Sequence, residues 1–534
     1  MLRIVLSRLK ILLIGFMVCQ SAFAWSSQAC VVSAEYRASN VGATILKAGG
    51  NAVDAAVAMA FALAVVHPGC GNLGGGGFAL IHMNDNFFAL DFREDSPEKL
   101  KVSDWRQASK KRKVFLSTAV PGTVAGLMAM HQRFGQLSLH QDMQAAIQLA
   151  YKGFPLVAGD LFFIQQGLKH TEFSSEAKKI FSDHGDPLEA GDYLYQPALA
   201  KTLRTISNQG GAAFYHGRIA DDLLAYVHKY GGLITKKDLE HYRVHWFKPL
   251  TCFYRGYEII TMPPPSQGGY VICRSLNLLK DRPLAKYKPL SQQPVTSMVK
   301  AMRQSFKEAK QFLGDPDQMQ VSAQRLISDP QARKMMRTPK VRIQTNEGLH
   351  TTSLVVVDQA GNAVSLTYSL NHFFGNGQMP PKLGFFLNNT IKDFNFNDQA
   401  LPNSYHPDHT PMSSIAPTMI MKGKQLSIIM GTPGGSTIPT QLIELITSVV
   451  DHHLSLKQAL NLPRFHAKGQ AVCLEKHAKE KVKKRFASWF PKLEFGLPFG
   501  FDAWGGAVVI QRDGKNGWKG AVDPRRPAGS VAKL

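Results

Sequence analysis

Two strand-forming runs joined by a turn lie near the middle of this 534-residue chain and constrain its fold most strongly. Thr351 and Thr352 open the first run, and the turn-forming residues 358–362 separate it from the second, which ends at Asn371. Side chains of a strand point alternately to its two faces. One face of the second run is apolar and the other carries hydroxyls and an amide: Val364, Leu366, Tyr368 and Leu370 against Ser365, Thr367, Ser369 and Asn371. The pattern predicts a β-hairpin with one face in the core and one face fitted for polar chemistry.

The position of Thr351 at the start of a strand indicates a nucleophile that is released by cutting the chain. A threonine hydroxyl needs a base beside it, and cleavage after His350 would free the α-amine of Thr351 itself. That amine has a reference pKa of about 7.7 to 8.0 and can accept the hydroxyl proton near neutral pH. Thr352 is a rival nucleophile, and a plain hairpin is the alternative, because Thr and Val are good strand formers.

A series of short motifs follows along the chain between about residue 34 and residue 525. They are Gly74-Gly75-Gly76-Gly77-Phe78, Asp91-Phe92-Arg93-Glu94, Val120-Pro121-Gly122-Thr123-Val124-Ala125-Gly126, Thr351-Thr352-Ser353, Leu366-Thr367-Tyr368-Ser369-Leu370-Asn371, Leu387-Asn388-Asn389 with Asp393-Phe394, Pro411-Met412-Ser413-Ser414-Ile415-Ala416-Pro417-Thr418 and Gly431-Thr432-Pro433-Gly434-Gly435-Ser436. In this ordered set the chain resembles the γ-glutamyltransferases, which belong to the N-terminal nucleophile hydrolase superfamily.

The resemblance implies an α+β fold, a four-layer αββα sandwich built jointly by both halves of a self-cleaving precursor. It implies cleavage between His350 and Thr351, giving a large subunit of residues 25–350 and a small subunit of residues 351–534. It also implies hydrolysis of glutathione or other γ-glutamyl compounds, with transfer of the glutamyl group to water or to amino acids. No metal and no organic cofactor is expected.

The same resemblance assigns roles in catalysis. Thr351 is the nucleophile, Thr352 hydrogen-bonds to it, and Ser369 keeps a hydroxyl where threonine is common. Gly434 and Gly435 match the oxyanion hole, whose N–H groups stabilise the tetrahedral intermediate.

A γ-glutamyl group also carries an α-carboxylate and an α-ammonium, so it needs a cation and an anion placed together. Arg93 is expected to bind the carboxylate with help from the hydroxyls of Ser413 and Ser414. Asp393 is expected to bind the ammonium with help from Asn371 and Thr390.

Three departures from the family pattern affect these expectations. Ser353 stands where many members have histidine. Thr390 stands where Gln or Glu is usual, and its shorter side chain is expected to bind the ammonium less strongly. Only 19 residues, 394–412, separate Asp393 from Ser413. This segment is too short for the lid loop of typical members and predicts a more open cleft.

The amino terminus has the features of a secretory signal, residues 1–24. Arg3, Arg8 and Lys10 precede the apolar residues 11–18, and Ala22-Phe23-Ala24 offers small residues at the cleavage positions. A lipid anchor at Cys19 is the less favoured alternative. The longest other apolar run, residues 55–66, is too short to span a bilayer and predicts a buried helix. The mature chain is therefore expected to be exported, to periplasm or medium.

Five cysteines remain after the signal, without a Cys-x-x-Cys pair. This number argues against a disulfide framework and against a zinc site. Pairing of Cys252 with Cys273 stays open, but free buried thiols are favoured.

A formal net charge of +23 distinguishes the composition. Basic residues cluster at 110–113 and 481–485, which would suit a polyanion. Because basic residues are otherwise scattered and no nucleic-acid-binding motif accompanies them, a generally cationic surface is the preferred interpretation.

Other segments predict one compact unit. Residues 78–82, 86–92 and 254–262 are expected to be strands, and residues 297–312 a helix. The glycine-rich residues 69–77 lack the Gly-Lys-Ser/Thr ending of a phosphate-binding loop, so the glycines are expected to permit close backbone approach. Two other functions stay open: an acylase of β-lactam side chains on the same scaffold, and an inactive polyanion-binding protein.

Overall fold

The computed structural model describes residues 28–183, 185–330, 351–467, 469–496, 504–514, 517–526 and 528–534. The predicted signal sequence, His350 and the polar approach to it lie outside the described residues. No helix in these ranges is both long enough and apolar enough to cross a membrane.

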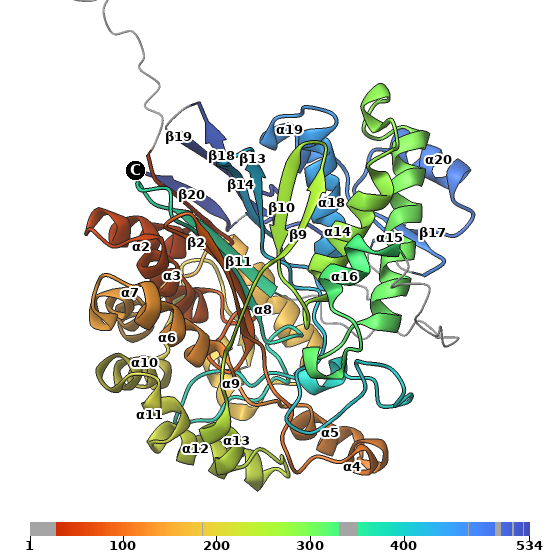
Figure 1. Ribbon diagram of the computed structural model, residues 1–534. Coiled ribbons are helices and arrows are strands. Elements are labelled where there is room, and N and C mark those ends of the chain that lie inside the picture. The colour runs from red at the N-terminus through yellow and green to blue at the C-terminus, as the bar shows by residue number, and fades with distance from the viewer. Residues whose placement is uncertain are drawn as a thin grey trace, which may run out of the picture.

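Two antiparallel sheets form the centre of the molecule (Figure 1). The first has the strand order β20 (Ser530–Lys533), β1 (Cys30–Ser33), β11 (Thr351–Val357), β12 (Ala363–Ser369), β2 (Gly76–Met83), β3 (Asn86–Phe92) and β8 (His245–Phe247). The second has the order β19 (Gly517–Val522), β18 (Val508–Asp513), β14 (Gln425–Gly431), β13 (Thr418–Lys422), β10 (Tyr257–Thr261) and β9 (Leu250–Tyr254). Strands β1, β11 and β12 of the first sheet contact β14, β18 and β19 of the second, so the sheets pack face to face.

Helices cover the outer face of each sheet and complete four layers, α, β, β and α (Figure 1). The first sheet is covered by α2 (Tyr36–Lys47), α3 (Ala52–Val66), α6 (Thr123–Phe134) and α7 (Leu139–Lys152). The second is covered by α14 (Gln267–Leu279), α15 (Gln292–Phe312) and α18 (Thr437–Val450). The predicted αββα sandwich is confirmed, and each sheet contains strands from both sides of the predicted cut.

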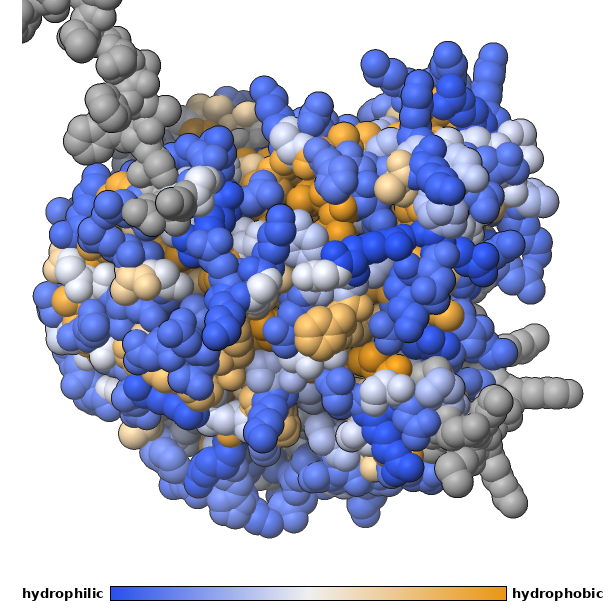
Figure 2. All heavy atoms as spheres, turned by 45° about the horizontal axis from the view of Figure 1, so that its top comes forward, coloured by the Kyte–Doolittle hydropathy of each residue, from blue (hydrophilic) through white to orange (hydrophobic). Residues whose placement is uncertain are grey.

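The remaining helices lie around these layers. They are α4 (Val102–Gln107), α5 (Lys110–Leu116), α8 (Ala158–His170), α9 (Ser175–Phe181), α10 (Pro197–Gln209), α11 (Ala212–Tyr215), α12 (Arg218–Lys229), α13 (Lys236–His241), α16 (Ala323–Ser328), α19 (Leu456–Asn461) and α20 (Glu480–Trp489). The two basic clusters lie on separate elements, α5 and α20. The face of the molecule in Figure 2 is largely hydrophilic, with hydrophobic residues in scattered patches.

The apolar helix predicted over residues 55–66 is the central helix α3, in which every residue is buried. It packs on β11 and β12, and the apolar face of β12 meets it there: the Tyr368 hydroxyl donates to the carbonyl of Ala60 at 2.7 Å. The apolar face of the predicted hairpin therefore does lie in the core.

The strand predicted over residues 254–262 is instead a turn and two strands, β9 and β10, which pair with each other. Arg255 and Gly256 separate them, both in the left-handed region, with φ of 52° and 81°. Gly256 adopts this conformation at no steric cost, and two successive positive φ values fit the twist of a tight hairpin. The expectation of one strand over residues 254–262 missed this turn, although a glycine within a strand pattern is a turn signal.

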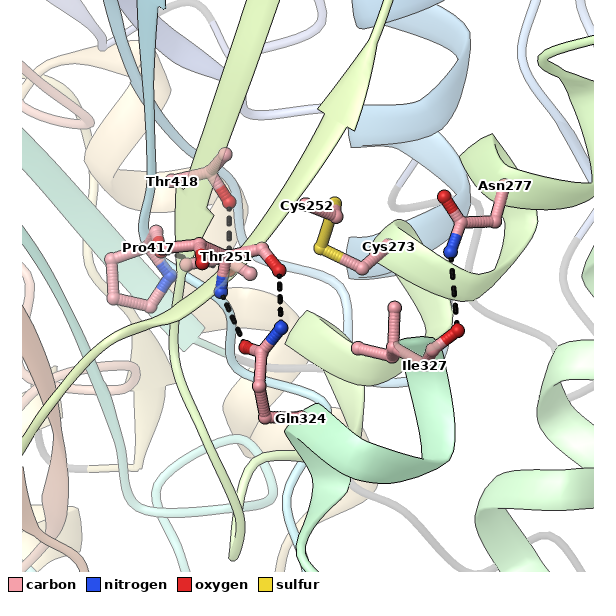
Figure 3. The surroundings of a disulfide bond; sticks show 9 residues. Thr251, Cys252, Cys273, Asn277, Gln324, Ile327, Pro417 and Thr418 are labelled. Atoms are coloured by element: carbon pink, nitrogen blue, oxygen red, sulfur yellow. Dashed lines mark hydrogen bonds between the residues drawn. A yellow bond between two sulfur atoms is a disulfide. The ribbon is translucent and has the colours of Figure 1, made fainter. Parts of the chain in front are cut away.

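Cys252 of β9 and Cys273 of α14 form a disulfide, with 5.7 Å between their Cα atoms (Figure 3). The expectation of free thiols is wrong for this pair, because the sequence does not show that α14 packs against β9. Beside the disulfide, the Gln324 side chain of α16 bonds the backbone of Thr251 in both directions, at 3.1 and 3.0 Å. Three other cysteines, Cys30, Cys70 and Cys473, are free and buried.

Replacing both Cys252 and Cys273 by serine should lower the free energy of unfolding by about 3 kcal/mol, because the bond closes a loop of about 20 residues. Urea unfolding of the wild type and the double variant under oxidising conditions measures the difference. With a reductant present the two curves should converge. Equal stability without reductant would contradict a stabilising bond.

Candidate active site

Thr351 lies at the first position of β11, directly opposite Ser369 of β12. Side chains at 351, 353 and 355 share one face of β11, and this face looks toward the second sheet. There the hydroxyls of Ser353 and Thr367 lie 2.9 Å apart, and the Ser365 hydroxyl donates to the carbonyl of Met430 in β14 at 2.9 Å. The hydroxyl row predicted from sequence thus runs between the sheets and ends at Thr351 and Ser369.

Thr352 lies on the other face of β11. Its Oγ1 is buried and has no hydrogen-bond partner among the described residues, and its methyl group faces Gly71, where a Cβ atom would come within 2.5 Å of it. The expected hydrogen bond from Thr352 to Thr351 is therefore not formed by this hydroxyl. The reason is the strand geometry, which sends neighbouring side chains to opposite faces.

A small pocket that opens to solvent brings most of the predicted residues together. It is lined by Arg93, Thr351, Ser369, Asn371, Asp393, Ser413, Ser414, Ile415 and Gly435. Eight of these were predicted, and Ile415 was missed although it lies within a quoted motif. Of the other predicted residues, Thr352, Thr390 and Gly434 do not line the pocket, and His350 lies outside the described residues.

Arg93 and Asp393, the predicted cation and anion for the substrate, contact each other across the pocket. Nη2 of Arg93 lies 2.7 Å from Oδ2 of Asp393, and both side chains are almost fully buried. Nε of Arg93 is buried without a hydrogen-bond partner among the described residues. A buried donor without an acceptor is costly, so Arg93 retains capacity for an anion from outside.

Glu94 lies behind Arg93 and was not assigned a role from sequence. Its carboxylate accepts from Nη1 of Arg93 at 3.0 Å and from the Thr390 hydroxyl at 2.9 Å. Thr390 is fully buried and does not line the pocket. Its hydroxyl contacts Glu94, which in turn contacts Arg93. Burial raises the pKa of Glu94 and raises that of nearby Asp91 to about 7.

Asn371 has φ of 76°, in the left-handed region that asparagine tolerates better than most residues. Its backbone N–H donates to the Ser369 hydroxyl at 2.8 Å, and its Nδ2 donates to Oδ1 of Asp393 at 2.9 Å. The unusual backbone thus turns the amide toward Asp393 and fixes this carboxylate beside Arg93.

The start of α14 holds Ser413 and Ser414 in place. The N–H of Gln267 donates to the Ser413 carbonyl at 2.8 Å, and that of Ser413 donates to the Pro265 carbonyl at 3.0 Å. Nε2 of Gln267 donates to the Ser414 hydroxyl at 3.2 Å. No role was assigned to residues 263–267 from sequence, so this support was missed.

Gly434 and Gly435 connect β14 to α18 and have φ of 130° and 54°. A Cβ atom on Gly434 would lie 2.3 Å from the Thr437 hydroxyl, which itself donates to the Gly434 carbonyl at 2.8 Å. The turn therefore requires glycine at 434 and brings Gly435 to the pocket. Ser436 is the N-cap residue of α18, although its side chain makes no capping bond.

The segment between Asp393 and Ser413 packs on itself and on α4, and none of its residues lines the pocket. Phe396 stacks on Trp105 of α4 at 4.8 Å and on Tyr405 at 5.0 Å between ring centroids.

The glycine-rich loop, residues 69–77, shows the close backbone approach that was expected of it. A Cβ atom on Gly75 would lie 2.1 Å from the Ser369 carbonyl. Close backbone approach, which only glycine allows, joins this loop to the end of β12.

Comparison with known proteins places this geometry in a family. The family model for gamma-glutamyltranspeptidase matches residues 38–533. The chain belongs to the γ-glutamyltranspeptidase family. The glutathione hydrolase proenzyme of Pseudomonas sp. (strain A14) is 36% identical and that of Escherichia coli (strain K12) is 37% identical. The matches cover 93% of both chains in the first case, and 83% of this chain and 81% of the relative in the second.

Solved structures agree with this membership. Cephalosporin acylase from Bacillus halodurans superimposes with a TM-score of 0.85 at 27% identity, covering 95% of this chain and 96% of the acylase. Helicobacter pylori gamma-glutamyltranspeptidase is 36% identical with a TM-score of 0.52, covering 57% of this chain and 91% of that one. The family therefore includes relatives named as proenzymes, and its fold is shared with an acylase.

Proposed function

We propose that this member of the family is a self-processing γ-glutamyl hydrolase and transpeptidase with Thr351 as its nucleophile. The observation that carries the proposal is one pocket in which Thr351 and Gly435 meet the Arg93–Asp393 pair. The first two groups suit acyl transfer, and the pair suits the amino-acid end of a γ-glutamyl group. The names of the relatives, glutathione hydrolase proenzymes, support the same substrate class.

Self-cleavage begins with attack of the Thr351 hydroxyl on the carbonyl carbon of His350. The hydroxyl proton passes to the leaving nitrogen as the C–N bond breaks, and an ester joins His350 to the threonine oxygen. Water then hydrolyses this ester, which leaves a carboxylate on His350 and a free amine on Thr351. The products are a large subunit, residues 25–350, and a small subunit, residues 351–534.

Catalysis uses the same hydroxyl with the new amine as its base. The Thr351 oxygen attacks the γ-carbonyl of the donor, and N–H groups of the Gly434–Gly435 turn stabilise the oxyanion. Collapse of the tetrahedral intermediate expels the donor's amine with the proton taken from Thr351. The γ-glutamyl ester on Thr351 then passes to water or to the amine of an amino acid or peptide.

Substrate binding is proposed to open the Arg93–Asp393 contact. The donor's α-carboxylate binds Arg93, whose Nε lacks an acceptor among the described residues, with hydroxyls of Ser413 and Ser414 as further donors. The α-ammonium binds Asp393, which Asn371 orients. The ligand's carboxylate takes the place of Asp393 as the partner of Arg93, and its ammonium takes the place of Arg93 as the partner of Asp393. Neither side chain is therefore left as a buried charge without a partner.

Export of the chain is part of the proposal. The signal-like residues 1–24 suggest it, and the Cys252–Cys273 disulfide supports it, because such bonds persist in oxidising compartments.

An acylase of β-lactam side chains is the second candidate, favoured by the high structural similarity to cephalosporin acylase. A glutaryl group has the length of a γ-glutamyl group but lacks the ammonium, so Asp393 would have no partner in it. The test is to compare kcat/KM of the processed enzyme for γ-glutamyl-p-nitroanilide and glutaryl-p-nitroanilide. We expect a preference of at least about 100-fold for the γ-glutamyl compound, the value of one buried ion pair. Equal or better use of the glutaryl compound would favour the acylase, and no hydrolysis of either would favour an inactive protein.

A further inference from the structure

Three side chains from three helices meet on the outer side of the first sheet, and none of them lines the active-site pocket. Asp54 lies in the first turn of α3, His131 in the last turn of α6 and Asp142 in the first turn of α7. One ligand atom from each lies within 4.8 Å of the others. Figure 1 shows these three helices side by side on the first sheet.

The side chain of Asp142 is the strongest observation. The residue has 0% exposure, and neither carboxylate oxygen has a hydrogen-bond partner among the described residues. Oδ2 lies 3.7 Å from Nε2 of His131, so the carboxylate points into the cluster. A buried carboxylate without partners costs several kcal/mol, and Asp54 adds a second negative charge nearby.

Asp54 is oriented by the backbone. Its carboxylate accepts from the N–H groups of Asn51, Gln136 and Leu137, and that of Gln136 is shared between the two oxygens. Each of the two oxygens accepts two of these contacts, all from neutral backbone N–H groups, so the negative charge of Asp54 is not neutralised by them. Fixed outer contacts of this kind orient ligating carboxylates in metal sites.

A fourth possible ligand atom lies beside His131. The carbonyl of Leu137 lies 2.9 Å from Nε2 of His131. Two carboxylates, one imidazole nitrogen and one carbonyl oxygen are ligands that a first-row divalent ion accepts, and the imidazole favours zinc over magnesium or calcium. His131 is half-buried, which leaves a route from solvent.

We propose that Asp54, His131 and Asp142 bind one zinc-type divalent ion that ties α3, α6 and α7 together. Metal binding supplies the positive charge that Asp142 lacks, and Nε2 of His131 turns from the Leu137 carbonyl to the ion, with the ring proton on Nδ1.

The test uses the processed enzyme after dialysis against a chelator. Its melting temperature and its calorimetric binding isotherm are measured with ZnCl2 for the wild type, Asp142→Asn, His131→Gln and His140→Gln. His140 is the matched control, because it is an exposed histidine on the same helix α7 and is not part of the cluster. Self-cleavage of each variant reports that it has folded.

We expect one zinc ion per wild-type chain and a rise in melting temperature, both retained in His140→Gln. Asp142→Asn and His131→Gln should bind zinc at least about 10- to 100-fold more weakly and lose the rise. MgCl2 at equal concentration should give no rise. Retention of the zinc response in Asp142→Asn or His131→Gln, an equal response to magnesium, or no response in the wild type would overturn the proposal.

Discussion

Thr351→Ala should abolish both self-cleavage and hydrolysis of a γ-glutamyl anilide. Without the hydroxyl, the carbonyl of His350 meets no nucleophile, so a denaturing gel should show a single full-length chain. Activity should fall by at least about 10⁴-fold, the effect of removing a catalytic nucleophile in comparable hydrolases. Thr351→Ser keeps a hydroxyl and should retain both reactions at a lower rate.

Thr352→Val is the matched control for this prediction. Valine has nearly the shape of threonine, and the Thr352 hydroxyl that it removes is buried without a partner among the described residues. The variant should therefore be cleaved and active, with little change in stability. Amino-terminal sequencing of its small subunit should begin at Thr351. Cleavage in Thr351→Ala, or a block in Thr352→Val, would reassign the nucleophile to the second threonine.

The contrast between these two threonines shows what the alternation of side chains along a strand can predict from sequence. Alternation along residues 364–371 predicted which face of β12 enters the core, and the structure places that face on α3. The same rule applied to β11 separates Thr351 from Thr352, although the resemblance placed a hydrogen bond between them. Local geometry was the better guide for Thr352, because strand neighbours cannot share a face.

Features that depend on packing between distant segments were not predictable. The disulfide requires β9 and α14 to be adjacent, and the support for Ser413 and Ser414 requires the start of α14 to meet the motif that follows residue 410. Thr390 was assigned to the substrate, but it contacts Glu94, which lies almost 300 residues earlier. A motif identifies residue types, whereas the partner of each side chain follows only from the folded arrangement.

The Arg93–Asp393 pair should determine which substrate the enzyme prefers. Asp393→Asn is therefore expected to remove most of the preference for the γ-glutamyl substrate over the glutaryl substrate. Asparagine keeps the size and an acceptor oxygen but removes the charge that would bind the α-ammonium. For γ-glutamyl-p-nitroanilide, kcat/KM should fall by about 10²- to 10³-fold, as expected when one partner of a buried ion pair is truncated. For glutaryl-p-nitroanilide, which has no ammonium, it should change by less than about tenfold, since this substrate gains nothing from the lost charge.

Asp398→Asn is the control for this comparison, because Asp398 lies five residues further along the same segment and does not line the pocket. It should leave both substrates unaffected. Self-cleavage of Asp393→Asn checks that Thr351 is still placed correctly, since that reaction involves no γ-glutamyl ligand. An equal loss for both substrates with normal cleavage would mean that Asp393 acts through the position of Arg93 alone. The ammonium would then be bound elsewhere, and the Arg93–Asp393 contact would be a structural ion pair whose charges the substrate does not replace.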